Sequence, residues 1–394
     1  MNAPKLRFKE FNDEWCLKTL NELYTFKNGI NGDRTQFGKG IKFISVSDIL
    51  NNNYITYDKI KGLIDIDEKT LLENSVEFGD ILFQRSSETR KDIGMSNVYL
   101  DSKLSTFGGF VIRGKKNKDN KNNPSFINYL LRSQTVRKDI VFRGAGAQHY
   151  NIGQEDLKKV SINIPSLVEQ NRISYLLELL DKKIELQTKK IEDLKLLKKG
   201  LINSIGKNIE IEKIPLKNIL AEQNHKTIKN NEYEILSSTS KGIYLQKDYF
   251  NKQAASDNNV GYKILKKNQL VLSPQNLWMG NININSKYNI GIVSPSYKIF
   301  DINNNIDIDF FDYWIKSPKA LYEYKISSEQ GASIVRRNLN MDLFYEIKVD
   351  IPKGKMQNKL GKIIKLLNLK IQYNENLLQK LQELKKGLMQ NMFV

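Results

Sequence analysis

The sequence predicts an α/β (α+β) protein of two similar halves, each a mixed domain followed by a long helix. Three observations predict it. A segment of about forty residues occurs twice. Both copies space their apolar residues as a coiled coil does. The roughly 150 residues ahead of each copy contain short runs that are typical of strands and helices. The expected fold is therefore two domains joined by two long antiparallel coiled-coil helices, with a pseudo-two-fold internal repeat.

The repeat is visible in short motifs that recur at one offset of 187 residues. The recurring pairs are Ile164-Pro165 with Ile351-Pro352, Gln170-Asn171 with Gln357-Asn358, and Lys198-Lys199-Gly200-Leu201 with Lys385-Lys386-Gly387-Leu388. Internal similarity at a fixed period indicates a repeated structural unit. The chain is expected to divide into a first domain (1–165), a first long helix (166–206), a second domain (207–352) and a second long helix (353–394).

Each repeated segment carries apolar residues at alternating spacings of four and three, which is an a/d heptad seam of about four heptads. The predicted seam of the first helix is Ile173, Leu177, Leu180, Ile184, Gln187, Ile191, Leu194, Lys198 and Leu201. That of the second is Leu360, Ile364, Leu367, Ile371, Asn374, Leu378, Leu381, Lys385 and Leu388. The alternative is that each helix lies on the core of its own domain. The narrow and equally long seams favour a coiled coil.

One uncharged polar residue stands at the centre of each seam, Gln187 in the first and Asn374 in the second. If the helices pair antiparallel, the two amides face each other. A buried polar pair of this kind sets the register of a coiled coil at some cost in stability. We expect that replacing both residues with Leu raises the melting temperature and loosens the register.

The two domains are expected to be mixed, since β-branched and aromatic residues form short runs in both. Predicted strands are 41–46, 80–83, 107–112, 160–164, 269–273 and 347–351. Predicted helices are 125–133, just after Pro124, and 309–317, just before Pro318. The segments between them are rich in Asn, Lys and Gly, as surface loops are.

Charge points to a nucleic-acid partner. The formal net charge is +18 over 394 residues, and the surplus is spread along the chain. An excess this large favours an acidic polymer as ligand; the alternative source is the Lys- and Asn-rich composition of an AT-rich genome. The lone Cys16 fits a cytoplasmic protein, and neither a signal peptide nor a membrane segment is expected.

No catalytic motif is expected to act in this sequence. The stretch from Gly32 to Gly40 lacks the spacing of a phosphate-binding loop, and no G-x-G-x-x-G follows a strand. Ser294-Pro295-Ser296-Tyr297 resembles the tetrapeptide of amino-methyltransferases but lacks its second proline. His149 and His225 with a single cysteine cannot form a structural zinc site. We therefore expect a non-enzymatic chain with no metal and no cofactor of its own.

Four segments are expected to carry side chains that could bind DNA bases and phosphates. Two follow matching strands, 83–91 and 273–278, and two lie ahead of the long helices, 143–150 and 331–338. The candidate DNA-binding residues are Gln84, Arg85, Ser86, Arg90, Lys91, Arg143, Gln148, His149, Tyr150, Gln275, Asn276, Trp278, Arg336, Arg337 and Asn338. The segments as groups are a better prediction than any single member.

The whole chain resembles the specificity subunits of type I restriction-modification systems. The resemblance rests on the opening Pro4-Lys5-Leu6-Arg7-Phe8-x-x-Phe11-x-x-x-Trp15, the strand motif Gly79-Asp80-Ile81-Leu82, and the duplicated run that begins at Ile164. The second copy departs at one position, where Met356 stands in place of Glu169. The seam behind that position is intact.

This resemblance implies two target-recognition domains, each reading one half of a bipartite double-stranded DNA sequence. It implies two modification subunits that use S-adenosylmethionine and two restriction subunits that use ATP and Mg²⁺ as partners. The competing interpretations are a stand-alone DNA-binding or anti-restriction protein, a self-sufficient methyltransferase and a purely structural coiled coil. The bases of the half-sites cannot be predicted, because the loops carry no local code.

Overall fold

The computed structural model describes residues 3–146, 149–208, 210–249, 258–330 and 337–394. The chain forms two compact units. The first contains Met1–Lys189 together with Asn376–Val394, and the second contains Lys190–Glu375. Both long helices, α7 (Leu167–Asn208) and α12 (Met356–Asn391), therefore contribute one part to each unit.

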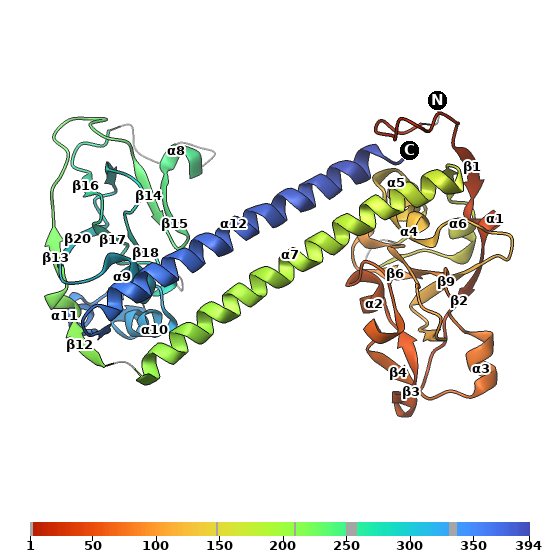
Figure 1. The fold of residues 1–394 in the computed structure, drawn as a ribbon, viewed down its shortest axis with the longest axis horizontal. Coiled ribbons are helices and arrows are strands. Elements are labelled where there is room, and N and C mark those ends of the chain that lie inside the picture. Colours follow the sequence, from red (N-terminus) through yellow and green to blue (C-terminus); the bar gives the residue numbers. More distant parts are fainter. Residues whose placement is uncertain (1–2, 147–148, 209, 250–257, 331–336) are drawn as a thin grey trace. The chain divides into compact units, whose positions relative to one another are not determined.

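The first unit is built around an antiparallel four-stranded sheet of order β2-β9-β5-β7 (Figure 1). Its strands and helices before α7 are β1 (Cys16–Thr19), α1 (Leu20–Leu23), β2 (Tyr24–Asn28), β3 (Phe37–Ile44), α2 (Val46–Leu50), β4 (Gly62–Ile64), α3 (Glu68–Glu73), β5 (Ile81–Gln84), β6 (Ser86–Ser87), β7 (Ser96–Val98), β8 (Thr106–Phe107), β9 (Val111–Lys116), α4 (Pro124–Arg132), α5 (Gln134–Arg143), β10 (Tyr150–Asn151), α6 (Gln154–Lys158) and β11 (Ser161–Ile164).

The second unit repeats this sheet with the order β13-β20-β17-β18. Its elements between the two long helices are β12 (Ile211–Pro215), β13 (Leu220–Gln223), β14 (Leu236–Thr239), β15 (Gly242–Leu245), α8 (Gln246–Tyr249), β16 (Lys263–Lys266), β17 (Leu270–Leu272), β18 (Ile282–Ile284), β19 (Ile290–Val293), β20 (Lys298–Ile302), α9 (Ile308–Trp314), α10 (Pro318–Ile326), β21 (Ser328–Gln330), β22 (Arg337–Leu339), α11 (Met341–Glu346) and β23 (Lys348–Pro352).

The internal repeat is a repeat of structure as well as of sequence. In each unit two helices follow the sheet, α4 and α5 or α9 and α10, and a last strand leads into a long helix. That strand pairs antiparallel with the unit's first strand: Cys16 of β1 lies opposite Ile164 of β11, and Ile211 of β12 lies opposite Pro352 of β23. The two variable regions therefore share a fold although their sequences do not match.

The a/d seam predicted for the long helices is buried or half-buried, which confirms the coiled coil. Fully buried members are Ile173, Leu177, Leu180 and Leu381 in the first unit and Ile191, Leu194, Leu360, Ile364 and Ile371 in the second. Ile184, Leu367 and Leu378 are half-buried. An ion pair joins α7 and α12 in each unit, Asp181 with Lys385 in the first and Lys195 with Glu375 at 2.6 Å in the second.

The central amides of the seam are buried, with 8% of Gln187 and 2% of Asn374 exposed. The Asn374 side chain donates to the Lys370 carbonyl at 2.6 Å on its own helix. Gln187 belongs to the first unit and Asn374 to the second. Their pairing with each other therefore stays a prediction.

The repeated Gln of the Gln-Asn motif joins each long helix to the helix pair of its own unit. The Gln170 side-chain oxygen accepts a hydrogen bond from the Asn123 amide at 3.0 Å, and Asn123 is the N-cap of α4. The Gln357 oxygen accepts from the Asp307 amide at 3.1 Å, and Asp307 is the N-cap of α9. The motif recurs because the same junction is built twice.

The repeated Lys acts at the opposite end of each long helix. The Lys385 ammonium of α12 lies 5.7 Å from the centre of the Tyr129 ring on α4. The Lys198 ammonium of α7 lies 5.8 Å from the centre of the Tyr313 ring on α9. The first turns of each long helix thus contact the helix pair of one unit, and the Lys near its other end contacts the helix pair of the other unit.

The two copies of the repeat differ at Glu169, which is replaced by Met356 in the second, because only Glu169 has a buried ion pair to make. Glu169 is buried, and its two carboxylate oxygens accept from Arg7 at 2.7 and 2.8 Å, which fastens the N-terminal segment to the first turn of α7. A fork-to-fork pair of this kind is stronger than a single charged hydrogen bond. Met356, the equivalent residue, is exposed at the start of α12.

The predicted strands and helices are found with shifted ends. Strand 41–46 ends at Ile44, because Ser45 and Asp48 form the capping box that starts α2. Strand 107–112 is interrupted between Phe107 and Val111 by a turn in which the Val111 amide donates to the Gly108 carbonyl at 2.8 Å. Helix 309–317 ends at Trp314. Among the described residues, no helix has an apolar stretch long enough to cross a bilayer.

Candidate nucleic-acid interface

In the first unit the structure joins the two segments predicted to contact DNA. The strand β6 within segment 83–91 pairs antiparallel with β10, which begins in segment 143–150. The Ser86 hydroxyl donates to the Asn151 side-chain oxygen at 2.5 Å, and the Ile152 amide donates to the Arg85 carbonyl at 3.0 Å. Segments sixty residues apart in the sequence therefore form one surface, which we call the first loop surface.

Most of the predicted residues on the first loop surface are accessible. Arg85, Arg90, Lys91 and His149 are exposed, and Ser86, Arg143 and Tyr150 are half-buried. Arg143 forms an ion pair with Asp139 at 3.0 Å. Gln148 lies outside the described residues.

Gln84 is the exception. Only 6% of its surface is exposed, and its side-chain amide donates to the Ser86 carbonyl at 2.8 Å. As the last residue of the buried strand β5, it supports the loop from beneath. The structure shows a supporting contact for Gln84, and its direct contact with DNA stays a prediction.

Arg137 of α5 is a supporting residue that the sequence analysis missed. One terminal nitrogen of its guanidinium donates to the Lys91 carbonyl at 2.9 Å and to the Ile93 carbonyl at 2.7 Å. Burial lowers the pKa of Arg137 to about 10, so it remains charged at neutral pH. These bonds fix the backbone that carries Arg90 and Lys91.

A third segment completes the first loop surface. The Arg85 amide donates to the Phe110 carbonyl at 2.9 Å, and the Arg85 guanidinium donates to the Gly109 carbonyl at 3.3 Å. The Phe110 side chain is 68% exposed. The sequence analysis placed these residues inside a strand predicted over 107–112, so it indicated neither this turn nor its contact with Arg85.

The second unit joins its two predicted segments in the same way. The Arg337 amide donates to the Gln275 carbonyl at 3.2 Å, which connects the hairpin of β21 and β22 to the loop after β17. Gln275 and Asn338 are exposed, and Asn276 and Trp278 are half-buried. We call this the second loop surface. Arg336 lies outside the described residues.

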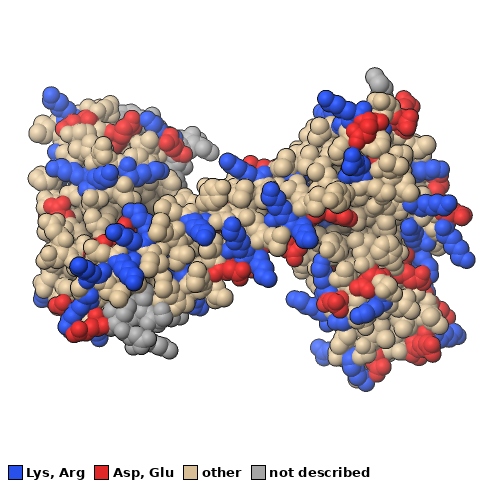
Figure 2. Space-filling model, viewed as in Figure 1, with Lys and Arg blue, Asp and Glu red and all other residues tan. Residues whose placement is uncertain are grey.

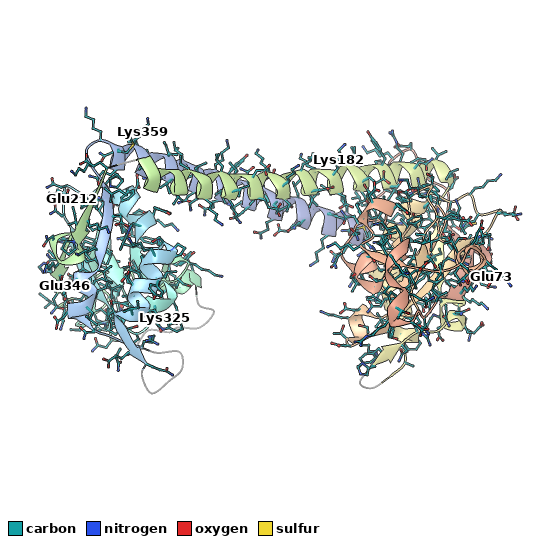
Figure 3. The ribbon with its side chains drawn as sticks, turned by 90° about the horizontal axis from the view of Figure 1, so that it is seen from below. Glu73, Lys182, Glu212, Lys325, Glu346 and Lys359 are labelled. Carbon is teal, nitrogen blue, oxygen red and sulfur yellow. The ribbon has the colours of Figure 1, made fainter. Side chains whose placement is uncertain are left out.

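The Arg337 side chain is bound within its own hairpin. Its guanidinium donates to the Ser328 hydroxyl at 2.9 Å, to the Ser328 carbonyl at 2.5 Å and to the Lys325 carbonyl at 3.3 Å. Lys325, labelled in Figure 3, is in the last turn of α10. These bonds make Arg337 an anchor for β21 and β22, and its binding to DNA stays a prediction.

Basic side chains are present over both units. In Figure 2, Lys and Arg side chains are spread over the visible face of each unit, with Asp and Glu among them. Lys182 and Lys359 (Figure 3) lie exposed on α7 and α12. Within the part of the chain that the structure describes, no three His, Cys, Asp or Glu residues are grouped so that they could hold a metal ion.

Comparison with known proteins gives three findings. Residues 12–196 match the family model of the type I restriction modification DNA specificity domain. The chain is 26% identical over 208 residues to a Methanocaldococcus jannaschii protein named as the type I restriction enzyme MjaX specificity subunit; the match covers 52% of this chain and 48% of that protein. The chain thus spans about half the length of this curated relative. The fold is similar to the crystal structure of a type I restriction-modification S subunit from M. genitalium, with a TM-score of 0.62 and 18% sequence identity. The match covers 100% of this chain and 99% of that one.

Proposed function

We propose that the chain is the DNA-reading specificity subunit of a type I restriction-modification system, because residues 12–196 match the family model of the type I restriction modification DNA specificity domain. The observation that carries the proposal is the recurrence of one construction. In both units, the loop after a central strand and the segment ahead of a long helix are hydrogen-bonded into a single surface. Two such surfaces suit a bipartite target, one half for each unit.

The side chains on the loop surfaces have the chemistry that this role needs. Exposed Arg85, Arg90 and Lys91 can bind guanine edges or phosphates, and Gln275 and Asn338 can bind adenine edges. Supporting residues hold the backbone beneath them, since Arg137 binds the carbonyls of Lys91 and Ile93 at the first surface, and Arg337 binds those of Ser328 and Lys325 next to the second. A fixed backbone reduces the entropy lost when the side chains bind DNA.

The chemistry of modification and cleavage belongs to partners in this proposal. Two modification subunits with S-adenosylmethionine methylate adenine, and two restriction subunits with ATP and Mg²⁺ cleave the DNA, while this chain binds and positions. The domain limits proposed for the chain are 1–165 and 207–352, with 166–206 and 353–394 as the helices between them. Because each helix runs without interruption through parts of both units, we propose that helix length sets the spacer of the DNA target.

The test is genome-wide adenine methylation in a host that expresses this chain with its modification subunit, compared with a host that lacks only this chain. We expect a bipartite N6-methyladenine motif that disappears on deletion. Arg85→Ala should alter only one half of the motif and Asn338→Ala only the other half. Lys182→Ala, on the exposed surface of α7, is the control and should leave both halves unchanged.

Methylation that does not change on deletion would overturn the proposal. Sequence-specific binding by the purified chain alone would then favour a stand-alone DNA-binding protein. Changes in both halves of the motif from either single variant would contradict the assignment of one half-site to each unit.

A further inference from the structure

The turn at 108–110 holds Phe110 on a rigid backbone. The Gly108 amide donates to the Ile44 carbonyl at 3.0 Å, and the Val111 amide donates to the Gly108 carbonyl at 2.8 Å. A Cβ atom on Gly109 would lie 1.9 Å from the Asn31 side-chain oxygen. A side chain at position 109 would therefore require the Asn31 side chain to move, and the two backbone hydrogen bonds hold the turn in place.

An apolar hollow lies beside this turn. Its volume is about 490 Å³, and its lining includes Phe37, Phe43, Val46 and Phe110. The Phe37 and Phe43 rings meet edge to face with their centres 5.4 Å apart. Phe110, at the rim, keeps 68% of its side chain exposed. The hollow thus combines an aromatic lining with an aromatic side chain that can still bury a large part of its surface.

Arg85 adjoins the same turn. Its backbone amide and its guanidinium donate to the carbonyls of Phe110 and Gly109 respectively. Within the described part of the chain, Gly109 is the one hydrogen-bond partner found for this guanidinium, which has five N–H donors. The remaining donors are available to the N7 and O6 acceptors of guanine, which arginine binds in the major groove.

We propose that Phe110 and the hollow receive the C5-methyl group of a pyrimidine next to the guanine that Arg85 binds. This inference rests on the proposed function and deepens it, because it assigns a base feature to one surface. Phenylalanine is among the side chains that contact the thymine methyl in the major groove. The same methyl occurs on thymine and on 5-methylcytosine. The first half-site would then contain a guanine beside a C5-methylated pyrimidine.

The experiment measures binding of the assembled chain and modification subunits to duplexes that carry the methylation motif. Each thymine is replaced in turn by uracil, which removes only the methyl, and each cytosine by 5-methylcytosine, which adds it. For thymine recognition we expect one uracil substitution beside a guanine to weaken binding about fourfold, as for the loss of one buried methyl. For 5-methylcytosine recognition we expect one added methyl to strengthen binding by a similar factor.

Phe110→Ala should remove this sensitivity, so that it binds methylated and unmethylated duplexes equally. Phe78→Ala is the matched control, because Phe78 is also exposed, at 56%, but lies ahead of β5 whereas Arg85 follows it. It should keep the wild-type sensitivity. The substitution series on the wild-type complex tests the proposal even if Phe110→Ala fails to fold.

Specific binding with no methyl effect beside a guanine would overturn the inference and leave the proposed function standing. An equal loss from Phe110→Ala on both duplexes would also overturn it and would indicate stacking of the ring on bases of any kind. Absence of any specific site for the wild-type complex would overturn both the inference and the proposed function.

Discussion

Two arginines, Arg137 and Arg337, have the same task in the two units. Each donates from its guanidinium to backbone carbonyls of the segment that carries exposed polar residues. Such bonds stabilise a loop more than neutral ones do, because the donor is charged. Arginine is suited to this because its planar group can bind several acceptors at once.

Arg337 and its neighbour Asn338 should therefore respond differently to substitution. Arg337→Ala removes three hydrogen bonds and is expected to lower the unfolding free energy of the second unit by roughly 1–3 kcal/mol. Asn338→Ala, at an exposed position, is expected to leave stability unchanged and to alter the methylation motif. Urea unfolding and methylation mapping of both variants would check this. Equal stability of the two variants would contradict the anchoring role of Arg337.

Asp80 connects the stability of the first unit to pH. Burial raises the pKa of its carboxyl to about 6, although the Lys116 and Glu77 amides donate to it and act in the opposite direction. Because the pKa of Asp80 is higher in the folded than in the unfolded chain, its protonated carboxyl contributes fully to the stability of the first unit below pH about 4. This contribution is lost as the pH rises through about 6.

We expect this titration to lower the unfolding free energy by roughly 2 kcal/mol between pH 4 and pH 7. The measurement is urea unfolding at several pH values for the wild type and for Asp80→Asn, which cannot titrate. The difference between the two should change by that amount over this range. Parallel profiles would show that the pKa of Asp80 is not raised.

At the scale of elements, the two long helices carry an equivalent Lys near their C-terminal ends, Lys198 and Lys385, but the charges around these two residues differ. Lys385 forms an ion pair with Asp181, which is 6% exposed and also accepts from the Tyr129 hydroxyl at 2.8 Å. Burial, and then Asp181, raise the pKa of Tyr129, so its hydroxyl stays protonated. In the second copy Asn368 occupies the position equivalent to Asp181.

The loss of Lys385 should therefore cost more than the loss of Lys198. Lys385→Met leaves the Asp181 carboxylate buried without its cation, and we expect a loss of roughly 2–4 kcal/mol in the first unit. Lys198→Met removes a contact with the Tyr313 ring and should cost less than about 1 kcal/mol. The double variant Asp181→Asn/Lys385→Met should recover most of the loss. Hydrogen exchange of α4 and α9 would report each unit separately, and equal protection in the two Lys variants would contradict the expectation.

At the scale of the whole molecule, the continuous helices α7 and α12 lead to a prediction about the DNA target. Seven residues inserted at equivalent points of both helices preserve the a/d pattern and add about 10.5 Å of helix. At roughly 3.4 Å for each base pair, we expect the spacer of the methylated motif to lengthen by about three base pairs with both half-sites unchanged. Methylation mapping of the insertion variant gives the answer. An unchanged spacer would show that helix length does not set it.

The sequence alone determined the parts of this protein that depend on neighbouring residues. The heptad seam, the two repeated segments and the positions of most predicted strands follow from periodicity, which is a local property. Motifs such as Gln170-Asn171 could be found by their recurrence, but their purpose is a contact with Asn123, forty-seven residues away. The net charge predicted a nucleic-acid partner before any geometry was known.

Only the tertiary structure decided which surface residues work together. It brought Ser86 within hydrogen-bond distance of Asn151, and Arg85 within hydrogen-bond distance of Phe110. It buried Gln84 and placed the Arg337 side chain in hydrogen bonds within its own hairpin. A single sequence cannot distinguish an arginine that faces DNA from one that binds carbonyls, because both lie in polar loops with similar neighbours. The physical reason is that hydrogen bonds between distant segments depend on how the sheet and helices pack, and no local pattern encodes that packing.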